Sequence, residues 1–214
     1  FFKANTDRVF VVGNCVSPQF LAGVENRFNN ILDDNRFKFI TITHNYPHKN
    51  LKSIGVVGRY LKDAGYDVVF IVTLPELTYS NMDECFKRYT INVGPVTLEE
   101  CSSLYRAANA LYLPTLIECF TVSYLEAMHV GLPIATSDLE FAKELCPDVC
   151  WYFDPYDDVS IASQLMSLIN EVSPTVLENL SVSYSEHLKR FGDNEHRVDG
   201  YFSIISNILS KERQ

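Results

Sequence analysis

The 214-residue chain lacks long hydrophobic runs and has little positive charge. No segment approaches the roughly 18 consecutive apolar residues that a membrane-spanning helix needs. Lys and Arg number 18 against 27 Asp and Glu, which gives a formal net charge of -9. Because nucleic-acid binding generally needs excess Lys and Arg against the phosphate backbone, we expect neither nucleic-acid binding nor a transmembrane span. A few local cations would still suffice for a small phosphate ligand.

The sequence also lacks the cysteine spacing of a disulfide or metal framework. Its six cysteines are scattered: Cys15, Cys85, Cys101, Cys119, Cys146 and Cys150. The closest pair, Cys146 and Cys150, encloses Pro147 and leads into the strand-like "CWYF", which argues against a metal-binding helix face. No Asp-x-Asp pair is present to hold a divalent ion. We therefore expect reduced, mostly buried thiols, no bound metal, and a cytoplasmic protein that is either free or peripheral at a membrane face.

Short apolar runs rich in β-branched and aromatic residues alternate with segments of helical periodicity. The runs that we interpret as strands are 8–14, 37–43, 66–74, 91–94, 109–114, 132–137 and 149–154. The helical patterns cover 50–65, 98–108, 121–131 and 158–172. Continuous apolar runs are typical of central strands covered on both faces, and strand-helix alternation forms right-handed parallel βαβ units. The sequence therefore predicts an α/β fold with a doubly wound, Rossmann-like parallel sheet.

The two ends of the chain differ from this alternating centre. Residues 1–20 hold the strand-like "RVFVVGN" and a Ser-Pro turn, and we interpret them as a linker, or as a strand leading in from a missing N-terminal domain. The segment 21–36 is less regular and is expected to be helical. Beyond the last strand pattern, residues 173–214 predict closing helices, with Ser173 as a cap and Pro174 in the first turn.

Ligands of an open parallel sheet bind beyond the carboxyl ends of its strands, where loops lead into helices. One such loop, "HNYPHKN" over residues 44–50, holds His44, His48 and Lys49 beside a proline turn. Asn50 is expected to cap a helix that begins near the following residue. These cationic groups would neutralise a phosphate, although this loop alone favours a solvated turn with incidental charges.

A second loop joins the predicted strand 109–114 to a helix that begins near Phe120 or Thr121. The free backbone amides of Phe120, Thr121 and Val122, together with the helix dipole, would form an anion site. The hydroxyls of Thr121 and Ser123 would add donors. This loop is therefore a second candidate for phosphate binding.

Glu118 and Glu126 lie on either side of this anion site. Glu118 lies just outside the helix, and Glu126 lies more than one turn inside it. Carboxylates accept hydrogen bonds from hydroxyl groups, so the pair would suit a ligand with phosphates in the middle and a sugar at each end. The spacing alone is weak evidence, because two other glutamate pairs in the chain repeat it. Only this pair has a strand before it and a helix running through it.

Taken together, these segments resemble the family-4, or group 1, retaining glycosyltransferases of the GT-B fold. The stretch "LYLPTLIECFTVSYLEAMHVGLPIATSDLEFAKELC" resembles the nucleotide-sugar motif in the C-terminal, donor-binding domain of that family. "YPHKNL" resembles the lysine loop, "VGPVTLEECSSLY" the base-side loop, and "WYFDPYDDVSIASQL" the strand and helix after the motif. The resemblance covers residues 8 to 172 and implies a donor-binding domain at 21–172.

The resemblance also implies a role for individual residues. It implies that Glu118 binds hydroxyls of the transferred sugar, Glu126 the ribose and Lys49 the diphosphate, with Glu118 and Lys49 catalytic. The implied donor-binding residues are His44, Lys49, Glu118, Cys119, Phe120, Thr121, Val122 and Glu126. The implied base contacts come from the backbone near Val93, Gly94, Val96 and Leu98. No metal or cofactor is implied beyond the nucleoside diphosphate sugar itself.

Three residues depart from the usual pattern of the family. His44 stands where an arginine is common, which replaces a permanent charge by a group that titrates near neutrality. Cys119 and Thr121 replace glycines, which narrows the space for close backbone approach. These departures leave the expected fold unchanged and slightly weaken the expectation of catalytic activity.

The resemblance implies the donor-binding half of a hexosyltransferase that moves a sugar from a nucleoside diphosphate to an acceptor hydroxyl. The acceptor, a sugar, a lipid-linked molecule or a protein, would bind mainly to a missing N-terminal domain. The chain begins with Phe1 rather than Met, as expected of a piece of a longer protein. Two alternatives stay open: a glycosyltransferase-like domain that binds nucleotide or scaffolds a partner without turnover, and a doubly wound domain with no ligand at this motif.

Overall fold

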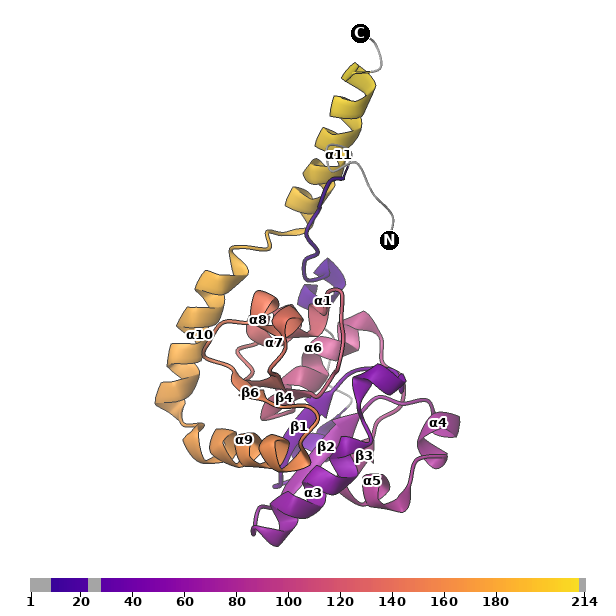
Figure 1. Ribbon diagram of the computed structural model, residues 1–214, viewed down its shortest axis with the longest axis vertical. Helices are drawn as coiled ribbons and strands as arrows, with labels where there is room; N and C mark the ends of the chain where they lie inside the picture. The colour runs from indigo at the N-terminus through magenta and orange to yellow at the C-terminus, as the bar shows by residue number, and fades with distance from the viewer. Residues whose placement is uncertain (1–8, 23–27, 212–214) are drawn as a thin grey trace.

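A parallel six-stranded sheet lies at the centre of the computed structural model, which describes residues 9–22 and 28–211 (Figure 1). The strand order is β3-β2-β1-β4-β5-β6. The strands are β1 (Phe37–Thr41), β2 (Val68–Val72), β3 (Thr90–Asn92), β4 (Ala110–Leu113), β5 (Ile134–Ser137) and β6 (Trp151–Phe153). This confirms the predicted α/β fold with a doubly wound, Rossmann-like sheet, and every predicted strand except the first is present.

Apolar side chains bury the central strands on both faces. Every residue of β2, β4 and β5 is buried. β1 and β2 pair in parallel register, from Phe37 opposite Val68 to Thr41 opposite Val72. A run such as "VVFIV" therefore forms a strand here because helices shield both of its faces.

The helices include all four predicted patterns and several short additions. The predicted ones appear as α3 (Ser53–Asp63), α6 (Leu98–Arg106), α7 (Val122–His129) and α9 (Asp158–Glu171). The short ones are α1 (Pro18–Ala22), α2 (Asn29–Leu32), η2 (Pro47–Lys49), α4 (Glu76–Ser80), α5 (Glu84–Tyr89) and α8 (Glu140–Leu145). The chain closes with α10 (Pro174–Leu188) and α11 (Asn194–Lys211). A helix of six residues or fewer spans less than two turns, so its period does not show in the sequence.

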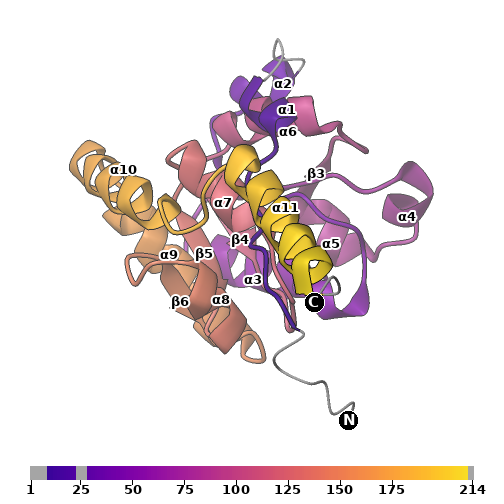
Figure 2. The ribbon, with the colours of Figure 1, turned by 90° about the horizontal axis from the view of Figure 1, so that it is seen from above.

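The helices form a layer on each side of the sheet (Figures 1 and 2). α3 packs between α5 and α9 on one side, while α6 packs with α1 and α7 packs with α10. Ser173 accepts a hydrogen bond from the Val176 amide, and Pro174 is the first residue of α10, which confirms the predicted cap and first turn. Within residues 9–22 and 28–211, no helix is long and apolar enough to cross a membrane.

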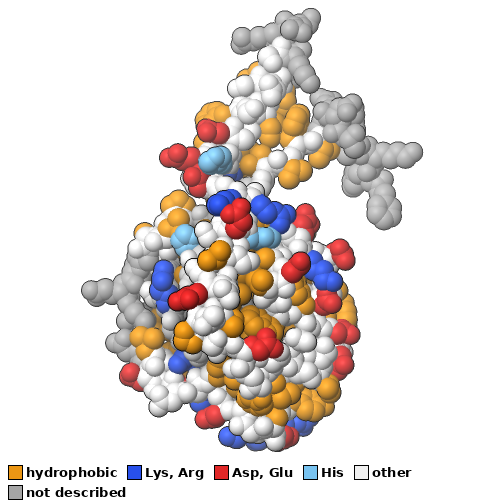
Figure 3. Space-filling model, turned by 90° about the vertical axis from the view of Figure 1, so that its left-hand side faces the viewer, with side chains coloured by type: hydrophobic (Ala, Val, Ile, Leu, Met, Phe, Trp, Pro, Cys, Tyr) orange, Lys and Arg blue, Asp and Glu red, His pale blue; other side chains and the backbone are white. Residues whose placement is uncertain are grey.

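The predicted strand at 8–14 is wrong over residues 9–14, and residue 8 lies outside the described part of the chain. Residues 9–16 join no sheet; they run beside α11, which projects from the domain (Figure 1). Arg197 donates a hydrogen bond from Nη1 to Asn14 Oδ1 at 2.9 Å, and Val11 is 91% exposed. An apolar run gains strand pairing only beside another strand, and the neighbour of this one is a helix. Apolar side chains of α11 are exposed as well (Figure 3), among them Tyr201, Phe202, Ile205 and Leu209.

The segment 21–36 is helical only in part. α1 ends at Ala22 and α2 covers four residues, while 23–27 lie outside the described residues. Phe20 of α1 and Ile31 of α2 are fully buried. Each short helix therefore packs on the core through one apolar side chain rather than through a continuous apolar face. The expectation of a helix here is therefore confirmed only for these two pieces.

Candidate functional site

The two predicted ligand loops lie side by side at the carboxyl end of the sheet. They follow β1 and β4, which are neighbours and pair Phe39 with Ala110. The loops also bond to each other: the His48 carbonyl accepts hydrogen bonds from the Leu116 amide at 2.7 Å and from Thr115 Oγ1 at 3.1 Å. The order of strands in the sheet therefore joins segments that lie far apart in the sequence.

Lys49 and Glu118 form an ion pair where these loops meet. Lys49 Nζ contacts Glu118 Oε1, and Thr115 Oγ1 lies 3.1 Å from the same oxygen. The two charged side chains are only 18% and 12% exposed. Charges this far out of water need partners, and each is the partner of the other. The structure thus brings together two residues that the sequence assigned to adjacent parts of one ligand.

The backbone turns sharply after Lys49. Asn50 has a positive φ of 52°, in the left-handed region that asparagine tolerates better than most residues. Its side chain donates to the Pro155 carbonyl at 3.1 Å, in the loop after β6. The prediction that Asn50 caps the next helix is wrong, because α3 begins at Ser53 and Lys52 takes its N-cap position. Asn50 instead ties the lysine loop to the loop after β6.

Three rings contact one another along the outer side of the lysine loop, His44 edge to face with Tyr46 and Tyr46 stacked on His48. The ring centroids of His44 and Tyr46 are 5.8 Å apart, and those of Tyr46 and His48 are 5.7 Å apart in a parallel stack. His44 and Tyr46 are exposed. Among the described residues His44 forms no ion pair, so its ring is available on the open side of the loop. It lies where the family resemblance expects a cation.

The N-terminus of α7 presents unsatisfied donors beside Glu118. The helix begins at Val122, one residue later than Thr121, and Thr121 takes the N-cap position without a side-chain cap. Thr121 Oγ1 is buried and has no hydrogen-bond partner within the described part of the chain. Leaving such a hydroxyl unpaired costs about 1–3 kcal/mol. Phe120 precedes the N-cap, and its ring lies 6.2 Å from that of Phe191.

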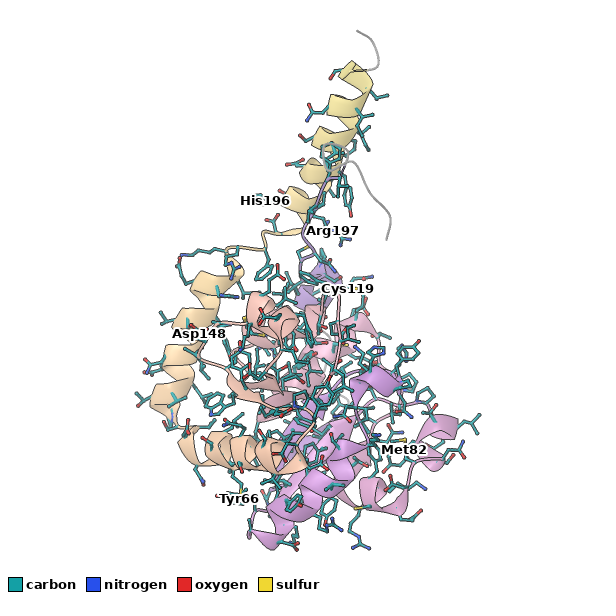
Figure 4. All side chains as sticks on the ribbon, viewed as in Figure 1. Tyr66, Met82, Cys119, Asp148, His196 and Arg197 are labelled. Atoms are coloured by element: carbon teal, nitrogen blue, oxygen red, sulfur yellow. The ribbon has the colours of Figure 1, made fainter. Side chains whose placement is uncertain are left out.

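Cys119 lies on the exposed side of the same loop (Figure 4). In that view it is at the upper border of the domain, the border from which α11 projects. Val122 is half-buried at the first position of α7. The candidate donor-binding residues on this loop thus range from an exposed thiol to a buried hydroxyl, along one turn of chain.

Glu126 lies inside the domain, on the buried face of α7. It is 7% exposed, and Tyr105 of α6 donates its hydroxyl to Glu126 Oε2 at 3.2 Å. Burial raises the pKa of Glu126, and the hydrogen bond from Tyr105 lowers it in part. Burial, together with the Glu126 charge, raises the pKa of Cys101 to about 12. Glu126 is thus separated from the Lys49–Glu118 pair and belongs to a polar cluster between α6 and α7.

The predicted base-side residues occupy the loop between β3 and α6. The Val93 amide donates to the Val72 carbonyl at 3.0 Å, which continues the sheet by one residue. Gly94 has a positive φ of 73°, and the next helix starts from a capping box between Thr97 and Glu100. Val93 and Val96 pack partly against the core, while Leu98 is 46% exposed. α6 connects this loop to Glu126 through Tyr105.

Sequence reasoning did not find the contributions of Thr115 and Tyr105. Thr115 is fully enclosed in the loop after β4, and Tyr105 is fully buried in α6. The helical period of α6 places Tyr105 on an inward face, but no local signal shows that its hydroxyl meets a carboxylate 21 residues away. Among the described residues no group of three or more His, Cys, Asp or Glu side chains is arranged to hold a metal ion.

Comparison with known protein families agrees with this geometry. A family model described as "Glycosyl transferases group 1" matches residues 53–171. The O-antigen chain mannosyltransferase RfbU of Salmonella typhimurium is 24% identical over 171 residues, which cover 78% of this chain and 46% of that protein. The region that the family model matches, residues 53–171, contains Glu118, Glu126 and the base-side loop.

Solved structures show the same fold. A glycosyltransferase from Rickettsia africae matches with a TM-score of 0.81 at 11% identity, over 97% of this chain and 59% of that one. A sucrose-phosphate synthase from Thermosynechococcus elongatus matches with a TM-score of 0.72 at 14% identity, over 93% and 52% of the two chains. The chain therefore spans about half the length of the relatives it matches.

Proposed function

Because the chain belongs to the group 1 glycosyltransferases and has the fold of half a GT-B enzyme, we propose that it is the donor-binding half. In this proposal residues 21–172 hold a nucleoside diphosphate sugar, and the whole enzyme transfers the sugar to an acceptor hydroxyl with retention. The observation that carries the proposal is the Lys49–Glu118 pair beside the open N-terminus of α7. It sets a cation, a carboxylate and backbone amides around one point.

Each of these groups suits one part of such a donor. The diphosphate gains negative charge as the bond to the sugar breaks, and Lys49 with the amides at the start of α7 would stabilise that charge. Glu118 would accept hydrogen bonds from sugar hydroxyls. The buried Thr121 hydroxyl would donate to a phosphate oxygen. These roles need no metal, because the cationic side chain and the helix terminus supply the positive potential.

Donor binding would then exchange one set of partners for another. Lys49 would leave Glu118 for a phosphate, and Glu118 would leave Lys49 for hydroxyls, so that neither charge is stranded out of water. Glu126 would bind the ribose through its remaining exposed edge, with the base against the loop that holds Gly94. His44 would add a ring N–H donor to the phosphates.

The sugar is a hexose in this proposal. The similarity to a mannosyltransferase makes a mannosyl donor the first to be tested. A second candidate function is nucleotide binding without transfer, and one observation favours it: His44 lies exposed on the outer side of the loop. A weaker grip on the departing diphosphate would impair transfer more than binding.

Calorimetric titration with UDP-, GDP- and ADP-linked hexoses tests the proposal directly. We expect one nucleotide class to bind, and Lys49→Met to weaken it by tenfold or more, which is about 1.4 kcal/mol. Lys52→Met is the matched control, because Lys52 is an exposed lysine three residues away with no ion pair in the described structure. Failure of all donors to bind would disprove the proposal. Binding without transfer by the longer protein would favour the second candidate.

A further inference from the structure

A second concave site lies at the opposite end of the sheet from the Lys49–Glu118 pair. A pocket of about 600 Å³ opens there, and four cationic side chains line it: Arg36, Arg59, Lys62 and Arg88. Arg36 immediately precedes β1, so the pocket lies at the amino ends of the strands. A five-residue strand rises by about 3.3 Å per residue, which separates the two sites by roughly 15 Å or more.

Two glycines of α3 shape this pocket. A Cβ atom on Gly58 would lie 2.4 Å from the Tyr89 ring, and one on Gly55 would lie 3.0 Å from the Phe86 amide. α3 and α5 can approach this closely only because those positions have no side chain. The contact sets Arg59, the residue after Gly58, across from Arg88, the residue before Tyr89, and each arginine forms part of the pocket wall.

The four cations differ in how they are paired. Arg36 is held in a two-pronged ion pair by Asp34, with Nη2 to Oδ2 at 2.7 Å. Lys62 is 3.8 Å from Asp67, and both side chains are mostly exposed, so this pair is weak. The side chains of Arg59 and Arg88 form no ion pair or hydrogen bond within the described residues.

Two unpaired arginines in one pocket stand out in a chain of net charge -9. Lys and Arg side chains, with a few acids among them, are visible at the lower rim of the domain, far from α11, as well as near the base of α11 (Figure 3). Asp63 and Asp67 also line the pocket, so the four cations exceed the local carboxylates even when Asp34 is counted. A planar guanidinium matches the oxygens of a phosphate in paired hydrogen bonds.

We propose that this pocket binds a phosphate-bearing ligand through Arg59 and Arg88. The shared chemistry is a phosphate monoester or diester group, carried either by a soluble metabolite or by a lipid headgroup. Arg36, already oriented by Asp34, would form the floor of the site beside β1, and the volume leaves space for a small group attached to the phosphate. The site is independent of the donor site and of the proposed function.

Inorganic phosphate tests the pocket with a defined probe. The titration uses a Lys49→Met background, so that phosphate at the donor site does not contribute, and follows the arginine Nε–H signals by NMR. Loss of one signal in Arg59→Gln and of another in Arg88→Gln assigns them. We expect phosphate to shift both signals. In Arg59→Gln/Arg88→Gln, we expect the affinity for phosphate, measured from the remaining phosphate-induced shifts around the pocket, to fall by tenfold or more. Arg106→Gln, at an exposed and unpaired arginine ending α6, is the charge-matched control.

Vesicles distinguish the two sources of phosphate. Sedimentation with phosphatidylcholine vesicles, with and without phosphatidic acid, reports headgroup binding. Retention that needs phosphatidic acid and is lost in Arg59→Gln/Arg88→Gln supports the site and assigns it to a lipid. Phosphate binding without vesicle retention supports the site and assigns it to a soluble ligand. Unchanged arginine signals with phosphate and no retention by either vesicle overturn the proposal, as does an equal loss of binding in Arg106→Gln.

Discussion

Lys49 and Glu118 are 69 residues apart in the chain and form an ion pair at the carboxyl end of the sheet. Each charge lies mostly out of water, so each depends on the other. The pair also fastens the loop after β1 to the loop after β4. Its two members therefore affect stability and ligand binding together, and the experiments below separate those effects.

We expect Lys49→Met to lower the free energy of unfolding by about 1–3 kcal/mol, because it leaves a mostly buried carboxylate without its cation. Lys49→Met/Glu118→Gln should recover part of this loss, since no charge is then unpaired. Urea unfolding measures both variants, with Lys52→Met as the control for removing a lysine. Equal losses in the single and double variants would show that the pair does not act as a unit.

Substitutions of the two glutamates should affect binding of the two ends of the donor separately. Glu126→Gln should weaken a bare nucleoside diphosphate, whereas Glu118→Gln should spare it and weaken only the sugar-bearing donor. Removing a hydrogen bond to a charged group costs about 1–3 kcal/mol, which sets the expected loss in each case. Calorimetry with the nucleotide and with its sugar conjugate measures the difference. An equal loss for the bare nucleotide in both variants would mean that the roles are assigned wrongly.

Thr121→Val should separate binding from stability. Valine keeps the shape of threonine, and the hydroxyl that it removes is buried and unpaired in the described structure. Unfolding stability should therefore stay within about 1 kcal/mol of its value or rise, while nucleoside diphosphate binding weakens. Thr136→Val is the matched control, because Thr136 Oγ1 lies 2.6 Å from the Tyr124 hydroxyl and donates to the Leu113 carbonyl at 3.2 Å. Thr136→Val should destabilise, and a larger destabilisation by Thr121→Val would refute the idea of an unmet donor.

The parallel sheet could be predicted from the sequence because buried strands leave continuous apolar runs. The positions of both ligand loops followed, since parallel strands end on the same side. The contact between Lys49 and Glu118 could not be predicted, because it depends on β1 and β4 being neighbours, and no local pattern encodes strand order. The strand predicted at 8–14 was wrong for a related reason: its apolar run has the same local pattern beside a helix as beside a strand.

Other parts of the site depend on contacts that short patterns do not carry. Asn50 looks like a helix cap in sequence, yet its amide reaches Pro155, 105 residues away. Tyr105 satisfies Glu126 across two helices. Side chains that meet through tertiary packing are therefore the part that short sequence patterns do not predict, whereas positions at a strand end or a helix start can be predicted from such patterns.

Stability should fall with rising pH because of Glu126. Burial raises its pKa in the folded state above the ordinary value, so the folded protein holds a proton that the unfolded chain releases first. The loss should begin above about pH 4.3, the ordinary glutamate pKa, and level off above the raised pKa. Urea unfolding across this range should show wild type losing stability relative to Glu126→Gln. A pH-independent difference between the two would contradict the raised pKa.

The 214-residue chain should bind donor and transfer nothing. Transfer requires the acceptor hydroxyl within about 3–3.5 Å of the reacting carbon in an aligned pose, which needs protein on both sides of the donor. The chain covers 46% of a mannosyltransferase and 59% of a solved glycosyltransferase, so under the proposed division we expect the acceptor wall in the part that this chain does not cover. Radiolabelled donor mixed with the purified chain should show saturable binding and, at most, slow hydrolysis.

A longer protein carrying a second domain should transfer, and Glu118→Gln in that protein should abolish transfer while nucleoside diphosphate binding persists. Transfer by the 214-residue chain as a monomer, at an ordinary enzymatic rate, would refute this division of the enzyme and the position assigned to the acceptor.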